Sequence, residues 1–275
     1  MRQQRATPPA AERGRPWLAA AGVALIVTAL AVTGLARRYV VAESAQFVVF
    51  AMVAPALIVL GAPWRLLRLS NAAGPGPGQL GTAPLDRLAA ARRPQTSFLR
   101  AAGFLVVVLA TGVAWRLPPV VDALARHPAL VAVELVTLLA AGLGLWLELV
   151  SSPPLAPRLP NPHRAAVAAL AMWSIWAVAY ALGLANHAVF HGYDGPGSAL
   201  SGVADQQITV ALVWAVSACC FVPVVFVALL RWLSAGDNPD EELQRLARDD
   251  RQLPVVRGWG RPARVQRTRG TDGAQ

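Results

Sequence analysis

The sequence contains no lysine: all 25 of its basic residues are arginine, against 15 acidic residues, so the net charge is +10. Electrostatics alone would lead us to expect both lysine and arginine, and we infer no function from the absence of lysine. A basic chain suggests nucleic acid binding, but these arginines lie between apolar runs, where lipid headgroups and membrane topology account for them. No folded soluble module remains to bind nucleic acid, and we therefore expect no such partner.

Cysteine is also scarce. The only two, Cys219 and Cys220, are adjacent within an apolar run, which excludes a disulfide framework. Buried free cysteine usually packs as a small hydrophobic residue, so we predict no redox role for either. No set of serine, histidine and acid and no nucleophile motif is visible, and we do not expect an enzyme.

Charged residues make up only 15% of the chain and hydrophobic residues 55%, and the mean hydropathy is +0.46. This composition is typical of an integral membrane protein. We predict an all-α bundle with transmembrane helices at about 17–35, 44–61, 101–117, 129–150, 165–184 and 208–230. The transmembrane domain, 17–233, follows a disordered arm, 1–16, and precedes a charged tail, 234–275. A cleaved signal peptide is the alternative for the first run, but the run is long for one and its sequel, ARRYV, is a poor cleavage site.

The second run, ESAQFVVFAMVAPALIVLGAP, contains Pro55 in its middle. Proline removes one backbone donor and leaves a carbonyl without its partner about one turn earlier, near Ala51. In lipid such a carbonyl requires another hydrogen-bond donor, which neighbouring helices can provide, so we expect this helix to be packed in the bundle. In the fourth run, Ala140 and Gly144 have the four-residue spacing that permits close helix approach. In the sixth run, Pro223 predicts a kink.

Arginine distribution predicts the orientation of the bundle. Six spans place both termini on one side, and 21 of the 25 arginines fall on that side. The opposite side has only Arg37, Arg38, Arg116 and Arg126. By the positive-inside rule, both termini are cytoplasmic, and we expect a multi-pass protein of the bacterial cytoplasmic membrane.

This orientation gathers the unusual polar residues at the outer face. They are Glu43, Gln46, His127, Glu134, His187, His191, Asp205 and Gln206. Glu134 lies about two turns inside its span, where a charge costs a few kcal/mol unless it is paired, protonated or hydrated. Its functional interpretation is a ligand or proton-bearing group in an outer cavity; its structural interpretation is a neutral acid bonded to a neighbouring helix.

Three histidines belong to this outer set. His127 is seven residues before Glu134, which would place both on one helix face if the helix began early enough. His187 and His191, four residues apart, would face one metal ion if they lay on a helix. The sequence NHAVFHGYDGPG runs into a glycine-rich stretch, which favours loop histidines at an interface instead.

Three stretches together resemble the polytopic CtaG-type assembly factors of bacterial haem-copper cytochrome c oxidases. They are QFVVFAMVAPALIVLGAPWRLL, HPALVAVELVTLLAAGLGLWLELVSSP and ALSGVADQQITVALVWAVSACCF. The second helix of the family usually begins with two histidines and two methionines, whereas this chain has Glu43, Ser44, Ala45, Gln46, Phe47 and Val48. Soft copper(I) prefers thiolate, thioether or imidazole ligands. We therefore expect any metal ligands to come mainly from the fourth to sixth helices.

The resemblance implies an assembly factor for a terminal oxidase, with oxidase subunits as partners. It also implies copper delivery or subunit maturation at the outer face, where His187, His191, His127, Glu134 and Asp205 are the candidate ligands. Two alternatives remain open. One is a proton-coupled small-solute transporter that uses Glu134 and Asp205, and the other is a structural membrane partner without metal.

Overall fold

The computed structural model describes residues 15–65, 89, 92, 98–185, 187–193, 201–234 and 239–252. Within these residues the chain is all-α and has no strand, only an isolated bridge between Ser152 and Leu155. The α-helices are α1 (Pro16–Ala31), α2 (Thr33–Ala36), α3 (Val40–Val48), α4 (Ala54–Gly61), α6 (Phe98–Trp115), α7 (Pro118–Arg126), α8 (Pro128–Leu149), α9 (Asn161–Gly183), α10 (Gly202–Leu233) and α11 (Pro239–Gln252). A π-helix, η2 (Val49–Val53), joins α3 to α4, and two short 3-10 turns are η3 (Pro63–Arg65) and η4 (His191–Tyr193).

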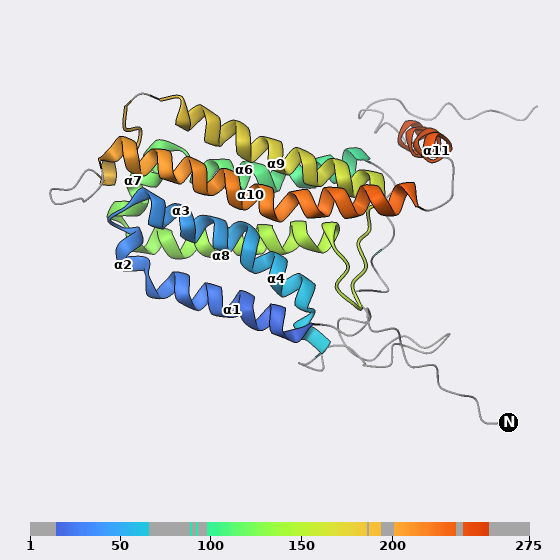
Figure 1. The fold of residues 1–275 in the computed structure, drawn as a ribbon, viewed down its shortest axis with the longest axis horizontal. Coiled ribbons are helices and arrows are strands. Elements are labelled where there is room, and N and C mark those ends of the chain that lie inside the picture. The colour runs from blue at the N-terminus through green and yellow to red at the C-terminus, as the bar shows by residue number, and fades with distance from the viewer. Residues whose placement is uncertain are drawn as a thin grey trace, which may run out of the picture.

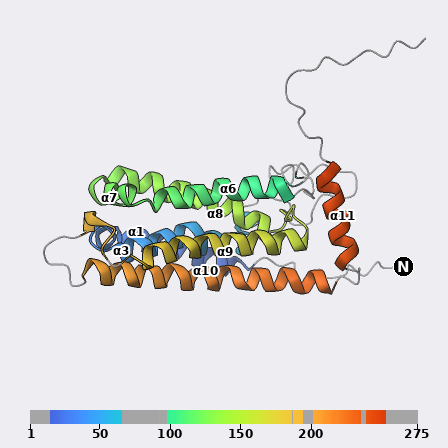
Figure 2. The ribbon, with the colours of Figure 1, turned by 90° about the horizontal axis from the view of Figure 1, so that it is seen from above.

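The long helices lie side by side along one axis and alternate in direction along the chain (Figure 1). The start of α1 and all of α11 lie at one end, which we name the α11 end. The opposite end, the α7 end, contains α2, α7 and η4. Figure 2 shows α11 running across the bundle axis. The expected disordered arm, 1–16, lies almost wholly outside the described residues, as does the tail beyond Gln252.

Among the described residues, four helical segments are long and apolar enough to cross a membrane: Val40–Gly61, Pro128–Leu149, Asn161–Gly183 and Gly202–Leu233. A fifth consists of Leu105–Trp115 and Pro118–Arg126 taken together, which are bent by 59° at their junction. The remaining predicted span corresponds to α1, an apolar helix of 16 residues. At 1.5 Å per residue it is about 24 Å long, less than the roughly 30 Å hydrocarbon core. Six spans therefore remain a prediction.

A further helix lies between the predicted third and fourth spans, 101–117 and 129–150. Residues 118–126, which belong to neither predicted span, form α7. Pro118 and Pro119 occupy the first turn of this helix, where a proline lacks only a donor that would be unpaired in any case. They therefore stop α6 and begin α7. Pro223, where a kink was expected, does not end the helix, since α10 is continuous over 32 residues.

The π-helix in the second span follows from Pro55. The π-helix η2 ends two residues before this proline, so the irregular turn contains Ala51, whose carbonyl was predicted to lose its partner. Gly142 of α8 packs against that carbonyl: a Cβ at Gly142 would lie 2.4 Å from the Ala51 oxygen. The close helix contact was predicted at Ala140 and Gly144 instead. That prediction is wrong for Ala140, which is exposed.

Close packing also joins α1 to α4. A Cβ at Gly61 would lie 2.4 Å from the backbone nitrogen of Ala19, and one at Gly22 would lie 3.0 Å from the carbonyl oxygen of Ala54. Small residues let helix backbones approach to this distance in lipid, where van der Waals contact drives association. The apolar α1 is therefore held along its length against the second span.

Candidate functional site

A buried ionic cluster occupies the α7 end of the bundle and consists of Glu43, Ser44, Arg116 and Glu134. Arg116 follows α6, and its guanidinium pairs with both carboxylate oxygens of Glu43 on α3: Nη1 donates to Oε2 at 2.9 Å, and Nη2 to Oε1. Nη1 also donates to the Ser44 hydroxyl at 2.9 Å. Nη2 is 3.6 Å from Oε1 of Glu134 on α8. One guanidinium thus connects three helices.

The cluster is almost wholly removed from solvent, since Glu43 is 5% exposed, Arg116 7% and Glu134 2%. The Arg116 guanidinium carbon also lies 4.0 Å from the centre of the Phe47 ring, a cation–π geometry. Two carboxylates face one guanidinium, and Oε1 of Glu134 has no hydrogen-bond partner. The structure therefore pairs Glu43 fully, whereas Oε1 of Glu134 faces Arg116 only by charge.

Asp205 on α10 holds the start of α3 in place. Its Oδ2 accepts a hydrogen bond from the Val40 backbone N–H at 2.7 Å, and its Oδ1 accepts one from the Val41 N–H at 2.8 Å. The first N–H groups of a helix have no partner within it, and the residue before α3, Tyr39, provides no side-chain cap. Asp205 is thus an N-cap supplied by another helix, and both of its carboxylate oxygens are occupied.

Two buried glutamines complete the polar connections at this end. Gln206 accepts from the Val189 N–H at 2.9 Å and donates to the Leu182 carbonyl at 2.8 Å, which fixes the segment after α9 to α10. Gln46 donates to the Thr33 hydroxyl at 3.0 Å and to the carbonyl of Ala29, which fixes the end of α1 to α3. Both glutamines therefore act as helix-to-helix links.

A small cavity lies beside the ionic cluster, with about 240 Å³ of atom-free space including its mouth. Glu43, Gln46, Glu134 and Tyr193 contribute to its wall. Burial raises the pKa of the Tyr193 phenol well above its usual range, and the charge of Glu43 adds to this rise. Tyr193 is therefore a neutral hydroxyl at physiological pH. Among the described residues, this wall offers mainly oxygen atoms, with the guanidinium of Arg37, and no imidazole.

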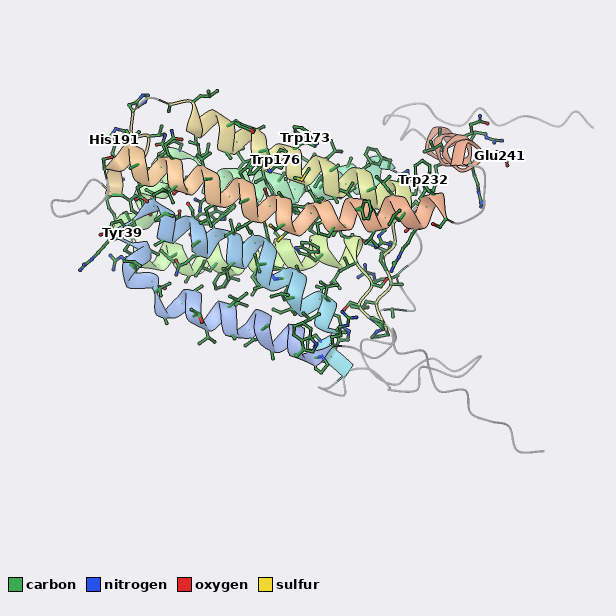
Figure 3. All side chains as sticks on the ribbon, in the orientation of Figure 1. Tyr39, Trp173, Trp176, His191, Trp232 and Glu241 are labelled. Atoms are coloured by element: carbon green, nitrogen blue, oxygen red, sulfur yellow. The ribbon has the colours of Figure 1, made fainter. Side chains whose placement is uncertain are left out.

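The three outer-set histidines are all exposed. His127 directly precedes α8, His187 lies after the end of α9, and His191 begins η4. Because α9 ends at Gly183, His187 and His191 do not share a helix face. Figure 3 places His191 and Tyr39 at the α7 end and Trp232 and Glu241 at the α11 end.

The predicted metal ligands are not brought together. In the parts of the chain that the structure describes, no three His, Cys, Asp or Glu residues form a group able to hold a metal ion. Glu134 lies in the ionic cluster, Asp205 caps α3, and the three histidines are on the surface. The metal assignment therefore stays a prediction.

A second ionic network, at the other end of α8, was not predicted. Glu148 accepts from Arg92 at 2.9 Å and from Nε of Arg158 at 2.8 Å, which ties two loops to the helix end. Burial lowers the pKa of Arg92, and the charge of Glu148 opposes this effect. Arg164 donates to the Leu149 carbonyl and so satisfies an acceptor in the last turn of α8.

Arg116 is the main residue that the sequence interpretation missed, because it counted only as one of four outer arginines. A signal was present. Glu43 and Glu134 were both placed at the outer ends of apolar runs, and a buried carboxylate requires a cation. Arg116 lies at the outer end of the third apolar run, 101–117, and was therefore the arginine that could have been predicted as this cation.

Comparison with known proteins agrees with the resemblance of the three stretches. A family model described as cytochrome c oxidase caa3 assembly factor (Caa3_CtaG) matches residues 1–235. No curated protein and no solved structure matches the chain. The family match includes every long apolar helix, from α1 to α10. The chain is therefore a member of the Caa3_CtaG family of cytochrome c oxidase caa3 assembly factors.

Proposed function

We propose that this protein assists assembly of a haem-copper cytochrome c oxidase in the bacterial cytoplasmic membrane and that it does so without catalysing a reaction. The observation that carries the proposal, beside family membership, is the polar α7 end. Glu43, Arg116, Asp205 and Gln206 join α3, α6, α9 and α10 there through buried contacts. Such contacts hold a surface in one shape, which suits recognition of an oxidase subunit.

The α7 end is the outer face in this proposal. By sequence, 21 of the 25 arginines fall on the side of the chain termini, and the start of α1 and α11 lie at the α11 end (Figure 1). The positive-inside rule then favours a cytoplasmic α11 end. Alkaline phosphatase fused after His191 should be active, and the same fusion after Gln252 should be inactive. The reverse pattern would overturn the orientation.

Copper delivery is the finer part of the proposal. His127, His187 and His191 are exposed at the α7 end, and imidazole binds copper. In this proposal the histidines hold copper only transiently, as cargo, and the buried carboxylates keep the helices that carry them in place. Glu134 and Asp205 would then act as structural groups, because the fold already gives them other partners.

Deletion and complementation test the assembly role. The strain that lacks the gene should contain less active oxidase with less copper per oxidase, and the wild-type chain should restore both. A variant with His127, His187 and His191 changed to alanine should restore neither if copper is the cargo. Fully metallated, fully active oxidase in the deletion strain would contradict the whole proposal.

A metal-free structural partner is the second candidate. It is favoured by one observation: Glu43, Asp205 and Gln206 are all occupied by contacts within the chain. The triple histidine variant separates the two candidates. If that variant restores oxidase copper and activity, and the purified wild-type protein binds no copper after loading, the protein acts by contact alone.

A further inference from the structure

A larger cavity lies within the bundle, between α6 on one side and η2, α8, α9 and α10 on the other. Its atom-free space is about 900 Å³ when the open mouth is included. Small-molecule sites are lined mostly by apolar side chains and carry a few placed polar groups. The wall of this cavity has that chemistry, because it is aliphatic and aromatic apart from Arg116, Ser174 and Thr209.

Ser174, midway along α9, donates its hydroxyl to the Leu170 carbonyl, so the polar groups that lack a partner lie at one end of the cavity. Arg116 lies at the α7 end, and Thr209 is in the second turn of α10, which starts there. The deeper wall includes Leu145 of α8 and Phe221 of α10. Thr209 and Phe221 are 12 residues apart on one helix, about 18 Å along its axis. One leaflet of the hydrocarbon core is about 15 Å thick, half of roughly 30 Å. The cavity therefore has the length and polarity of one lipid chain that enters from the α7 leaflet.

The polar end offers unused hydrogen-bond donors. The Thr209 hydroxyl, in a side chain 3% exposed, has no hydrogen-bond partner, and neither does Nε of Arg116. Buried polar groups are nearly always paired in native proteins, so two orphans on the wall of one cavity point to a ligand acceptor. The Glu43 carboxylate already balances the Arg116 charge, which disfavours an anionic acceptor. A neutral carbonyl fits both conditions.

We propose that this cavity binds one acyl chain of a phospholipid, with the ester carbonyl beside Thr209 and Arg116 and the chain end beside Leu145 and Phe221. The bilayer at the α7 end supplies this molecule directly. The site is separate from the exposed histidines and does not depend on the proposed function. In this proposal the lipid is part of the packed bundle, because its acyl chain fills the space between α6 and the neighbouring helices.

Photo-crosslinking in lipid nanodiscs tests both the site and the direction of the chain. The full-length protein is reconstituted with phosphatidylethanolamine that carries a diazirine either next to the ester carbonyl or at the chain end. The first probe should label peptides around Thr209, and the second should label peptides around Leu145 and Phe221. Labelling confined to outward-facing residues such as Val106 and Val107, which are 63% and 64% exposed, would overturn the proposal.

Two glycines of α6 provide a matched pair of variants. A Cβ at Gly112 would meet only Phe47, at 3.8 Å, so Gly112→Leu should enter the cavity without disturbing the backbone. A Cβ at Gly103 would meet nothing within 4 Å, and Gly103→Leu is the control with the same gain in helix propensity. Gly112→Leu should abolish labelling of the deep residues, and Gly103→Leu should leave it unchanged. Equal labelling in both variants would contradict the site.

Thr209→Val gives a second test that keeps the side-chain shape. It should reduce labelling by the carbonyl probe and the amount of phospholipid that co-purifies in native mass spectrometry. If the hydroxyl has no ligand, the same change should leave both unchanged and raise the melting temperature, because an unpaired buried hydroxyl is then removed. Displacement of the phospholipid probe by an isoprenoid quinone, at equal concentration, would also overturn the assignment.

Discussion

Replacing Arg116 by methionine should be among the most destabilising single substitutions in the bundle. The change removes the guanidinium that pairs with both Glu43 oxygens and with the Ser44 hydroxyl. Glu43, 5% exposed, would keep the Ser44 contact at 3.3 Å but would lose its cation. Removing one partner of a buried ion pair costs about 3–5 kcal/mol, because the other charge is left uncompensated. Against a total stability of about 5–15 kcal/mol, this is a large loss.

The measurement is the free energy of unfolding in detergent micelles, for Arg116→Met and for the matched control Arg126→Met. Arg126 is exposed at the same end of the bundle, and its Nε donates to the Asp122 carbonyl of its own helix. Its replacement should change the free energy of unfolding by no more than about 1 kcal/mol. Combining Arg116→Met with Glu43→Gln should recover much of the loss, since the stranded charge is then gone. Equal losses in the Arg116 and Arg126 variants would refute the reasoning.

Three further predictions concern contacts between segments. Gly142→Ala should cost about 1–3 kcal/mol of unfolding free energy, because its Cβ would meet the Ala51 oxygen at 2.4 Å, whereas Gly34→Ala, with nothing within 4 Å, should not destabilise. Asp205→Ala should lower the free energy of unfolding by about 2 kcal/mol, which is the upper end of the range for an N-cap. Ser201→Ala removes the exposed N-cap of α10 and should lower it by less; thermal unfolding of the two variants measures the difference. The pKa of Tyr193 is raised in the folded state, so above about pH 10 only the unfolded state releases the phenol proton. The free energy of unfolding should therefore fall as the pH rises above that value, and Tyr193→Phe should make this dependence weaker.

The apolar runs determine the helices, because in lipid every backbone group must be satisfied within a helix. The predicted spans at 129–150, 165–184 and 208–230 correspond to α8, α9 and α10 within a few residues at most boundaries. Part of the predicted charged tail, 234–275, forms α11. Family membership also followed from the sequence, since its motifs are ordered stretches of the chain and need no tertiary contact.

The roles of the polar side chains required the tertiary structure. Asp205 was predicted as a metal ligand, but it caps a helix that begins 165 residues earlier in the chain. Arg116 pairs with Glu43 across 73 residues, and no local pattern connects them. Which polar groups meet depends on how the helices rotate and pack, and that packing is decided by contacts such as Gly142 against Ala51. A sequence period determines which residues share a face of one helix, whereas the partner of that face is determined by the free energy of the whole bundle.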